Sequence, residues 1–94
     1  MNAYEIEKKL IELIDETIRI EMLQGDIIKF ENKENCDLMN DLGFDSLLMV
    51  KLIIDVENCF NLEFGLEDLN IEYLRKYQNL LKYIIDYLTT SSDT

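Results

Sequence analysis

Ser46 is the residue whose type and setting are best suited to chemistry. It lies in the stretch DLGFDSLLMV, residues 41–50, between Asp45 and a wholly apolar run. The chain contains no histidine, so it can form neither a histidine-assisted serine or cysteine nucleophile nor a histidine-based metal site. A glycine-rich phosphate loop is also absent, and with Asp+Glu at 20 in 94 residues chance pairs of carboxylates are expected everywhere. The sequence therefore predicts that the chain is not an enzyme and binds no metal.

The position of Ser46 suggests two roles for its hydroxyl. We expect Ser46 to cap and open a helix, where backbone N–H groups are unpaired and the helix dipole is positive. Both features would stabilise a phosphate esterified to the serine, and Gly43 supplies a turn that presents the side chain outward. On these grounds alone a simple helix cap is the commoner role, and an attachment point is the alternative.

The elements around Ser46 are expected to be helices. The chain has no proline, only 3 glycines, and many Leu, Ile, Glu and Lys residues, a composition that favours helix over short strands. Helices are predicted at about 3–22, 46–60, 67–74 and 78–88, the third being short. Asn2 and Glu5 resemble a capping box at the start of the first helix. Its core-facing stripe is predicted to be Ile6, Leu10, Leu13, Thr17 and Ile20.

A long loop, about residues 24–45, should connect the first two helices. Loops of this length are uncommon in small domains and are usually functional or anchored. Four scattered apolar residues suggest anchoring across the core: Ile27, Phe30, Leu38 and Leu42. Residues 1–88 are thus predicted to form one domain, and residues 89–94 a disordered tail with nothing to bury.

The helix at 46–60 has more apolar surface than a core requires. At 100° per residue, one narrow sector holds Met49, Ile53, Val56 and Phe60, flanked by Leu52 and Cys59. Leu47 and Ile54 point nearly opposite, beside Lys51 and Asn58, with Leu48 and Val50 on the flanks. A helix apolar on both faces is either fully buried or binds a partner. We expect partner binding for Leu47 and Ile54, whereas Leu48 and Val50 fit a core margin equally well.

Charge and cysteine usage limit the possible partners and the cell compartment of the chain. The net charge is −11, which disfavours nucleic acid as a partner because phosphate backbones require Lys and Arg. No apolar run is long enough to cross a membrane. Cys36 and Cys59 form no CxxC pair and no secretory signal is recognisable, so we expect reduced thiols in a cytoplasmic protein. Cys59 is expected to be an inert core thiol, whereas Cys36, in the loop, is less constrained.

The stretch DLGFDSL, Asp41–Leu47, resembles the 4′-phosphopantetheine attachment motif of acyl and peptidyl carrier proteins. The resemblance continues through LLMVKLIIDVENCFNLEF and, more loosely, to LLKYIIDYL, so that it covers about residues 4–88. It implies an all-α four-helix bundle of the acyl carrier protein type, with three longer helices, a short third helix and a long loop between the first two.

The resemblance also implies a function. Ser46 matches the serine that receives 4′-phosphopantetheine from coenzyme A, and Asp45 and Leu47 match the neighbours that a phosphopantetheinyl transferase reads. The residues that match the face on which partner enzymes dock are Leu47, Leu48, Val50, Lys51, Ile54 and Glu57. The chain would then be a monomeric, free-standing carrier that takes acyl or aminoacyl cargo from a loading ligase, as a thioester, and delivers it to downstream biosynthetic enzymes.

Two positions bear on the pathway. Carrier proteins of fatty-acid synthesis typically have acidic residues where this chain has Leu48 and Lys51. A basic residue at the position of Lys51 is more similar to the pattern of peptidyl carriers. GFDS with Asp45, in contrast, is more similar to acyl carriers. The sequence favours a specialised pathway of the nonribosomal peptide or polyketide kind. The alternatives are a fatty-acid carrier and a helical adaptor that binds partners without a prosthetic group.

Overall fold

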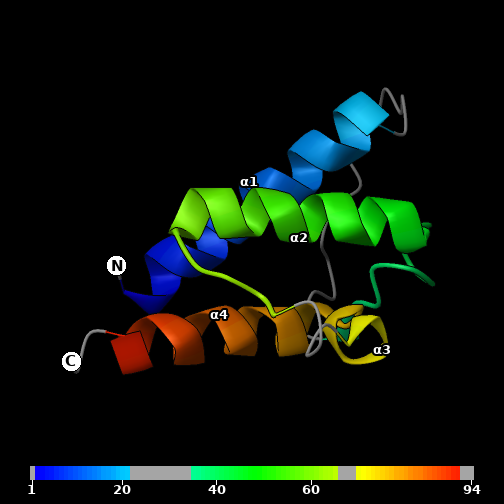
Figure 1. Cartoon of the computed structure of the whole chain (residues 1–94). Helices are drawn as coiled ribbons and strands as arrows, with labels where there is room; N and C mark the ends of the chain where they lie inside the picture. The colour runs from blue at the N-terminus through cyan, green and yellow to red at the C-terminus, as the bar shows by residue number, and fades with distance from the viewer. Residues whose placement is uncertain (1, 22–34, 66–69, 92–94) are drawn as a thin grey trace.

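The computed structural model describes residues 2–21, 35–65 and 70–91. These ranges contain four helices, α1 (Ala3–Glu21), α2 (Ser46–Phe60), α3 (Ile71–Leu74) and α4 (Tyr77–Ser91), and no strand beyond an isolated antiparallel bridge between Asp37 and Lys76. α1 packs against α2 and α4, and α3 packs against α4. In Figure 1, α2 and α4 run in the same direction, and α1 runs in the opposite one and crosses behind α2. The all-α prediction, with a long connection between α1 and α2, is confirmed.

α1 begins as predicted and buries three of the five predicted core residues, Ile6, Leu10 and Thr17. The Asn2 Oδ1 accepts a hydrogen bond from the Glu5 N–H at 2.8 Å, which confirms this cap. The buried residues are Ile6, Leu10, Ile14, Thr17 and Ile18. The prediction of Ile20 as a core residue is wrong, because its side chain is 58% exposed. Four of the buried residues, Ile6, Leu10, Ile14 and Ile18, are spaced four residues apart and form a row inclined to the helix axis. This row stays buried because α1 crosses α2 obliquely (Figure 1).

The segment that leads into α2 is anchored by apolar side chains, as expected. Leu38 and Leu42 are buried, and so are Cys36 and Phe44. Ile27 and Phe30, the other two predicted anchors, lie outside the described residues. Gly43 has φ of 80°, in the left-handed region that glycine enters without steric cost. The turn therefore depends on glycine at this position.

The boundaries of α2 agree with the prediction, whereas α3 and α4 differ from it. α2 ends at Phe60, and the next residue, Asn61, is the cap: it has left-handed backbone angles and donates its N–H to the Glu57 carbonyl. α3 begins at Ile71, where Asn70 is extended and its side chain caps the helix by accepting from the Tyr73 N–H. Residues 67–69 of the predicted helix lie outside the described residues.

α4 continues to Ser91, past the end predicted at residue 88, so residues 89–91 are helical where we expected a disordered tail. A last turn is held by backbone hydrogen bonds and needs no buried side chain. The division into a domain and a tail otherwise stays a prediction.

The core holds α2 in place along one face. Its buried residues are Met49, Leu52, Ile53, Val56 and Phe60, which confirms the predicted sector. Beyond the end of α2, Phe64 stacks on Tyr83 of α4 with ring centroids 4.6 Å apart, and the Phe64 N–H donates to Glu57 Oε2 at 3.1 Å. The C-terminal end of α2 is therefore fixed, and the helix face opposite the buried residues points outward.

Candidate functional site

Ser46 is the first residue of α2 and is exposed. The prediction that Ser46 caps the helix is wrong, because the cap is Asp45. Asp45 has extended backbone angles, and its Oδ1 accepts a hydrogen bond from the Leu48 N–H at 2.8 Å. Ser46 lies one position further along, inside the helix, where its side chain cannot accept from the Leu48 N–H in this way. Within the described residues the Ser46 hydroxyl makes no hydrogen bond, so it is available to react.

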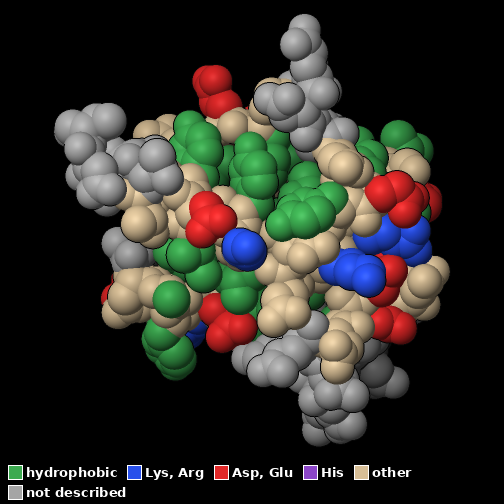
Figure 2. All heavy atoms as spheres, turned by 90° about the horizontal axis from the view of Figure 1, so that it is seen from below, with side chains coloured by type: hydrophobic (Ala, Val, Ile, Leu, Met, Phe, Trp, Pro, Cys, Tyr) green, Lys and Arg blue, Asp and Glu red, His purple; other side chains and the backbone are tan. Residues whose placement is uncertain are grey.

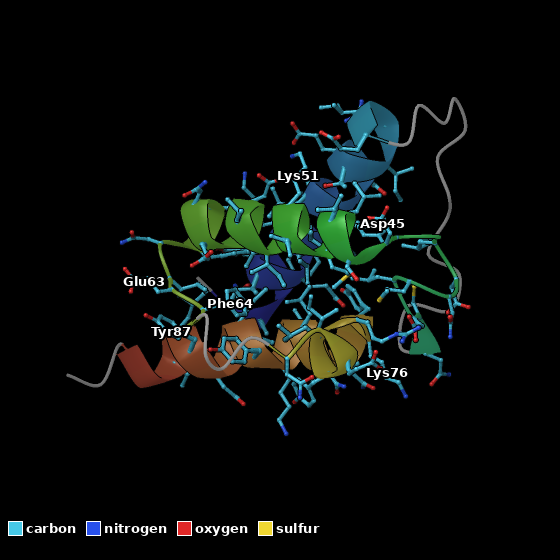
Figure 3. All side chains as sticks on the ribbon, turned by 45° about the vertical axis from the view of Figure 1, so that its right-hand side comes forward. Asp45, Lys51, Glu63, Phe64, Lys76 and Tyr87 are labelled. Carbon is cyan, nitrogen blue, oxygen red and sulfur yellow. The ribbon has the colours of Figure 1, made fainter. Side chains whose placement is uncertain are left out.

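The turn before Ser46 fixes the direction in which the helix starts. Phe44 and Leu42 are buried on either side of Gly43, and the Phe44 N–H donates to the Leu38 carbonyl at 3.0 Å. Two buried side chains flanking a left-handed glycine leave little freedom for the next residues. Figure 3 shows Asp45 at the start of α2, at the end of the molecule where α3 also lies.

The start of α2 suits a phosphate group bonded to Ser46. The Leu48 N–H is occupied by Asp45 Oδ1, and the Met49 N–H bonds to the Asp45 carbonyl. The N–H groups of Ser46 and Leu47 precede these two and belong to the first turn, whose amides have no partner inside the helix. With 15 residues in α2, the aligned peptide dipoles add positive potential at this end. The residues present therefore fit a phosphodiester at the Ser46 oxygen.

The outward face of α2 carries an apolar row. Leu47 is 80% exposed and Ile54 is 48% exposed, and Val50, between them, is partly exposed. Their spacing of three and four residues places them on one side of the helix. We call Leu47, Val50 and Ile54 the outer row. It begins one residue after Ser46, so a protein that reaches the serine also meets these side chains.

The other three predicted docking residues make contacts within the chain. Leu48 is partly buried and packs against the core. Glu57 accepts the hydrogen bond from Phe64 described above. The Lys51 Nζ lies 3.0 Å from Asp55 Oδ2 and 3.9 Å from Glu21 Oε1, and the hydrogen bond to Asp55 raises the pKa of Lys51. Lys51 points away from the core toward α1 in Figure 3, and its charge is largely balanced by its neighbours.

An ion-pair network beside the site was not found from the sequence. The Arg75 Nε lies 3.0 Å from Asp37 Oδ1, and Nη2 lies 3.0 Å from Asn40 Oδ1. Burial alone would raise the pKa of Asp37, but hydrogen bonds from the Asn40 backbone and the Arg75 side chain outweigh it and lower the pKa. The spacing Asp37–Asp41 could have indicated a capped turn, because the Asp37 N–H donates to Asp41 Oδ2 at 2.7 Å. No local pattern indicated Arg75.

Other kinds of site find no support in the described ranges. No group of three or more His, Cys, Asp or Glu side chains is arranged there to hold a metal ion, and none of the helices described has the length and apolarity to cross a membrane. Both cysteines are free thiols. Contrary to expectation, Cys36 is the more buried of the two; burial, followed by the charges of Asp41 and Asp37, raises its pKa to about 11.

Comparison with known proteins agrees with this geometry. The family model described as "Phosphopantetheine attachment site" matches residues 9–84. The chain belongs to the acyl and peptidyl carrier protein family. An acyl carrier protein of Syntrophus aciditrophicus (strain SB) is 32% identical over 79 residues, which cover 84% of this chain and 88% of that protein. No solved structure gives a significant match.

Family membership defines the cofactor and the general role. The group carried is 4′-phosphopantetheine, bound covalently. Proteins of this family are carriers rather than catalysts, and they interact with a phosphopantetheinyl transferase and with biosynthetic enzymes.

Proposed function

We propose that this chain is a carrier protein whose Ser46 holds 4′-phosphopantetheine, and that it carries acyl or aminoacyl cargo in the cytoplasm for a specialised biosynthetic pathway. When bound, the group supplies a terminal thiol on a flexible arm, which holds cargo as a thioester. The residues of this chain hold the phosphodiester at the start of α2 and offer the outer row to partner enzymes. They make and break no bond of the cargo.

The observation that carries this proposal is the setting of Ser46. Its hydroxyl is exposed and without a hydrogen bond in the described structure, because Asp45 takes the capping role. A serine that served only as a cap would have its oxygen on a backbone N–H. The separation of the two roles leaves one residue for the helix and the next for the modification.

The pathway is proposed from the outer row and its surroundings. Lys51 is paired with Asp55 and Glu21, Glu57 is bonded to the Phe64 backbone, and position 48 is leucine. The apolar row thus carries no free carboxylate of its own. Charge steering of association works best with opposed patches, so a partner with a strongly basic docking patch would gain little here. We therefore favour a specialised pathway.

A second candidate is a carrier of fatty-acid synthesis. The relative described above is named an acyl carrier protein, and Asp45 is similar to acyl carriers at this position. After modification, the protein can be offered in parallel to a malonyl transferase of fatty-acid synthesis and to amino-acid-activating ligases. Efficient loading by the transferase alone would favour this second candidate.

The attachment itself is tested by intact mass spectrometry. The protein is incubated with coenzyme A, Mg²⁺ and a broad-specificity phosphopantetheinyl transferase, beside Ser46→Ala and, as a matched control, Ser91→Ala at the end of α4. We expect one phosphopantetheine on the wild type and on Ser91→Ala, and none on Ser46→Ala. A folded wild type that gains no mass would overturn the proposal and favour the helical adaptor.

A further inference from the structure

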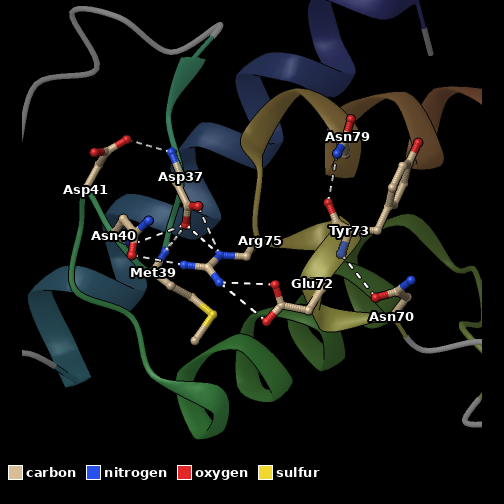
Figure 4. A network of polar contacts seen from close by, with 9 residues as sticks. All are labelled: Asp37, Met39, Asn40, Asp41, Asn70, Glu72, Tyr73, Arg75 and Asn79. Atoms are coloured by element: carbon tan, nitrogen blue, oxygen red, sulfur yellow. Dashed lines mark hydrogen bonds and ion pairs between the residues drawn. The ribbon is translucent and has the colours of Figure 1, made fainter.

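Arg75 joins the turn before Ser46 to α3. Its Nε and Nη2 bond to Asp37 and Asn40 of the turn, and its Nη1 lies 3.3 Å from Glu72 Oε2 of α3 (Figure 4). The side chains of Arg75 and Asp37 are only 18% and 15% exposed. A planar guanidinium that uses all three nitrogens holds its partners in a fixed geometry. We call these four side chains the clamp.

The backbone joins the same two segments. The Leu38 N–H donates to the Arg75 carbonyl at 2.7 Å, and the Tyr77 N–H donates to the Cys36 carbonyl at 2.9 Å. Leu38 in turn accepts from the Phe44 N–H, two residues before Ser46. A short chain of hydrogen bonds thus runs from Arg75 to the residues that orient the serine.

Asp37 is the point at which the turn and the clamp meet. Its Oδ1 accepts from the Met39 N–H at 2.9 Å and from the Asn40 N–H at 3.1 Å, as well as from Arg75. These two backbone bonds close the start of the turn. A carboxylate that already caps a turn is a rigid acceptor, so Arg75 binds a preformed structure and fixes its orientation.

α3 is a short element to which the clamp adds a link from the turn. It has four residues, of which only Leu74 is fully buried, and it packs against α4. So short a helix has little stability of its own. In Figure 1 it lies at the end of the molecule where α2 begins.

We propose that Arg75 is a positioning residue, which holds the turn 37–44 and α3 as one unit so that Ser46 is presented in a single orientation to the phosphopantetheinyl transferase. This inference rests on the proposed function. Arg75 acts through the turn, since its side-chain partners are Asp37, Asn40 and Glu72 and it forms no hydrogen bond with Ser46. Without the clamp the turn would sample several orientations, and the transferase would select one of them on binding. Affinity then falls with the competent fraction, whereas the chemical step, once bound, is unchanged.

The test is steady-state kinetics of the transferase with the carrier as the varied substrate. Arg75→Gln is compared with Lys76→Gln, which removes the same charge from the neighbouring exposed residue. We expect KM to rise roughly three- to tenfold for Arg75→Gln, in inverse proportion to the competent fraction that remains, with kcat unchanged and Lys76→Gln equal to wild type. Arg75→Lys, which keeps a cation for Asp37 but lacks the fork, should lie between.

Hydrogen exchange gives a second readout that needs no transferase. In Arg75→Gln the amides of Leu38 and Tyr77 should exchange roughly tenfold faster, while amides in the middle of α2 keep their rates, as expected for local opening. Equal KM values for Arg75→Gln and Lys76→Gln, a fall in kcat alone, or unchanged exchange would each overturn the inference.

The outcomes also separate this inference from the proposed function. A wild type that is never modified refutes both. If the wild type is modified at Ser46 and Arg75→Gln has the same KM as the wild type, only the positioning role is refuted. If Arg75→Gln lacks a helical far-UV spectrum, Asn40→Ala, which removes one arm of the clamp and leaves the Asp37 pair, is measured in its place.

Discussion

Asp45 has two contributions at the start of α2 that substitution can separate. Its Oδ1 caps the helix through the 2.8 Å bond from the Leu48 N–H, and its negative charge lies at the positive end of the dipole. Asparagine can keep the hydrogen bond and loses the charge, whereas alanine loses both. Loss of a capping side chain costs about 1 kcal/mol, and loss of a charge–dipole interaction at an exposed helix end costs roughly 0.3–1 kcal/mol.

The expected free energies follow directly. Asp45→Ala should lower the free energy of unfolding by about 1–2 kcal/mol, the sum of the two losses, and Asp45→Asn by less than about 1 kcal/mol. In a domain of this size, 1 kcal/mol corresponds to a shift in Tm of roughly 4–8 °C. The two variants should therefore be resolved by thermal unfolding followed by circular dichroism, with urea unfolding as a second measure.

The control is Asp86→Ala, which removes a carboxylate from an exposed position inside α4 and caps nothing. It should change stability by no more than about 0.5 kcal/mol. Equal destabilisation by alanine and asparagine would mean that charge alone matters and the hydrogen bond does not. A loss below about 0.3 kcal/mol for Asp45→Ala would refute the capping argument.

Three further predictions concern the turn, the core and a thiol. Gly43→Ala should lower the urea midpoint by an amount equivalent to about 1–2 kcal/mol, because a φ of 80° is costly for residues with a side chain; an unchanged midpoint would contradict this. Tyr77→Phe should cost about 1 kcal/mol, because it removes the 2.8 Å bond to Glu7 Oε2, whereas Tyr73→Phe, on the surface, should cost nothing measurable in the same urea titration. With its pKa raised to about 11, Cys36 has a thiolate fraction of about one in a thousand at pH 8. In a Cys59→Ser variant, where Cys36 is the sole cysteine, Cys36 should react with iodoacetamide at least about a hundredfold more slowly in the native protein than in urea. Comparable rates in the two states would refute the burial of Cys36.

The start of α2 and its two faces could be predicted because their signals are local. Ser46, the glycine before it and the apolar residues after it lie within one short stretch, and the periodicity of α2 separates Leu47 and Ile54 from the core without any knowledge of the other helices. The structure confirms the buried sector of α2 and leaves both residues exposed. The assignment of the cap failed by one residue, since Asp45 and Ser46 are both good capping types and only the backbone angles distinguish them.

Errors on the other helices arose where tertiary packing decides. A stripe chosen from α1 alone could include Ile20, because periodicity gives the shape of an apolar face but not its angle to the neighbours. The residues that are buried instead, Ile14 and Ile18, follow the crossing of α1 over α2 and α4. The end of α4 was underestimated for a related reason, since the prediction required buried side chains where backbone hydrogen bonds suffice.

The clamp could not be predicted, because its residues have no local relation to each other. Arg75 and Asp37 are 38 positions apart, and a chain with 20 acidic and 9 basic residues offers far more possible ion pairs than real ones. What selects this pair is the backbone, which bonds Leu38 to Arg75 and Cys36 to Tyr77 and so places both side chains at one point. The proposed attachment site at Ser46 is thus indicated by its immediate neighbours, whereas the positioning proposed for Arg75 depends on residues from another part of the chain. A substitution at Arg75 should accordingly leave the attachment motif intact and still change how readily it is modified.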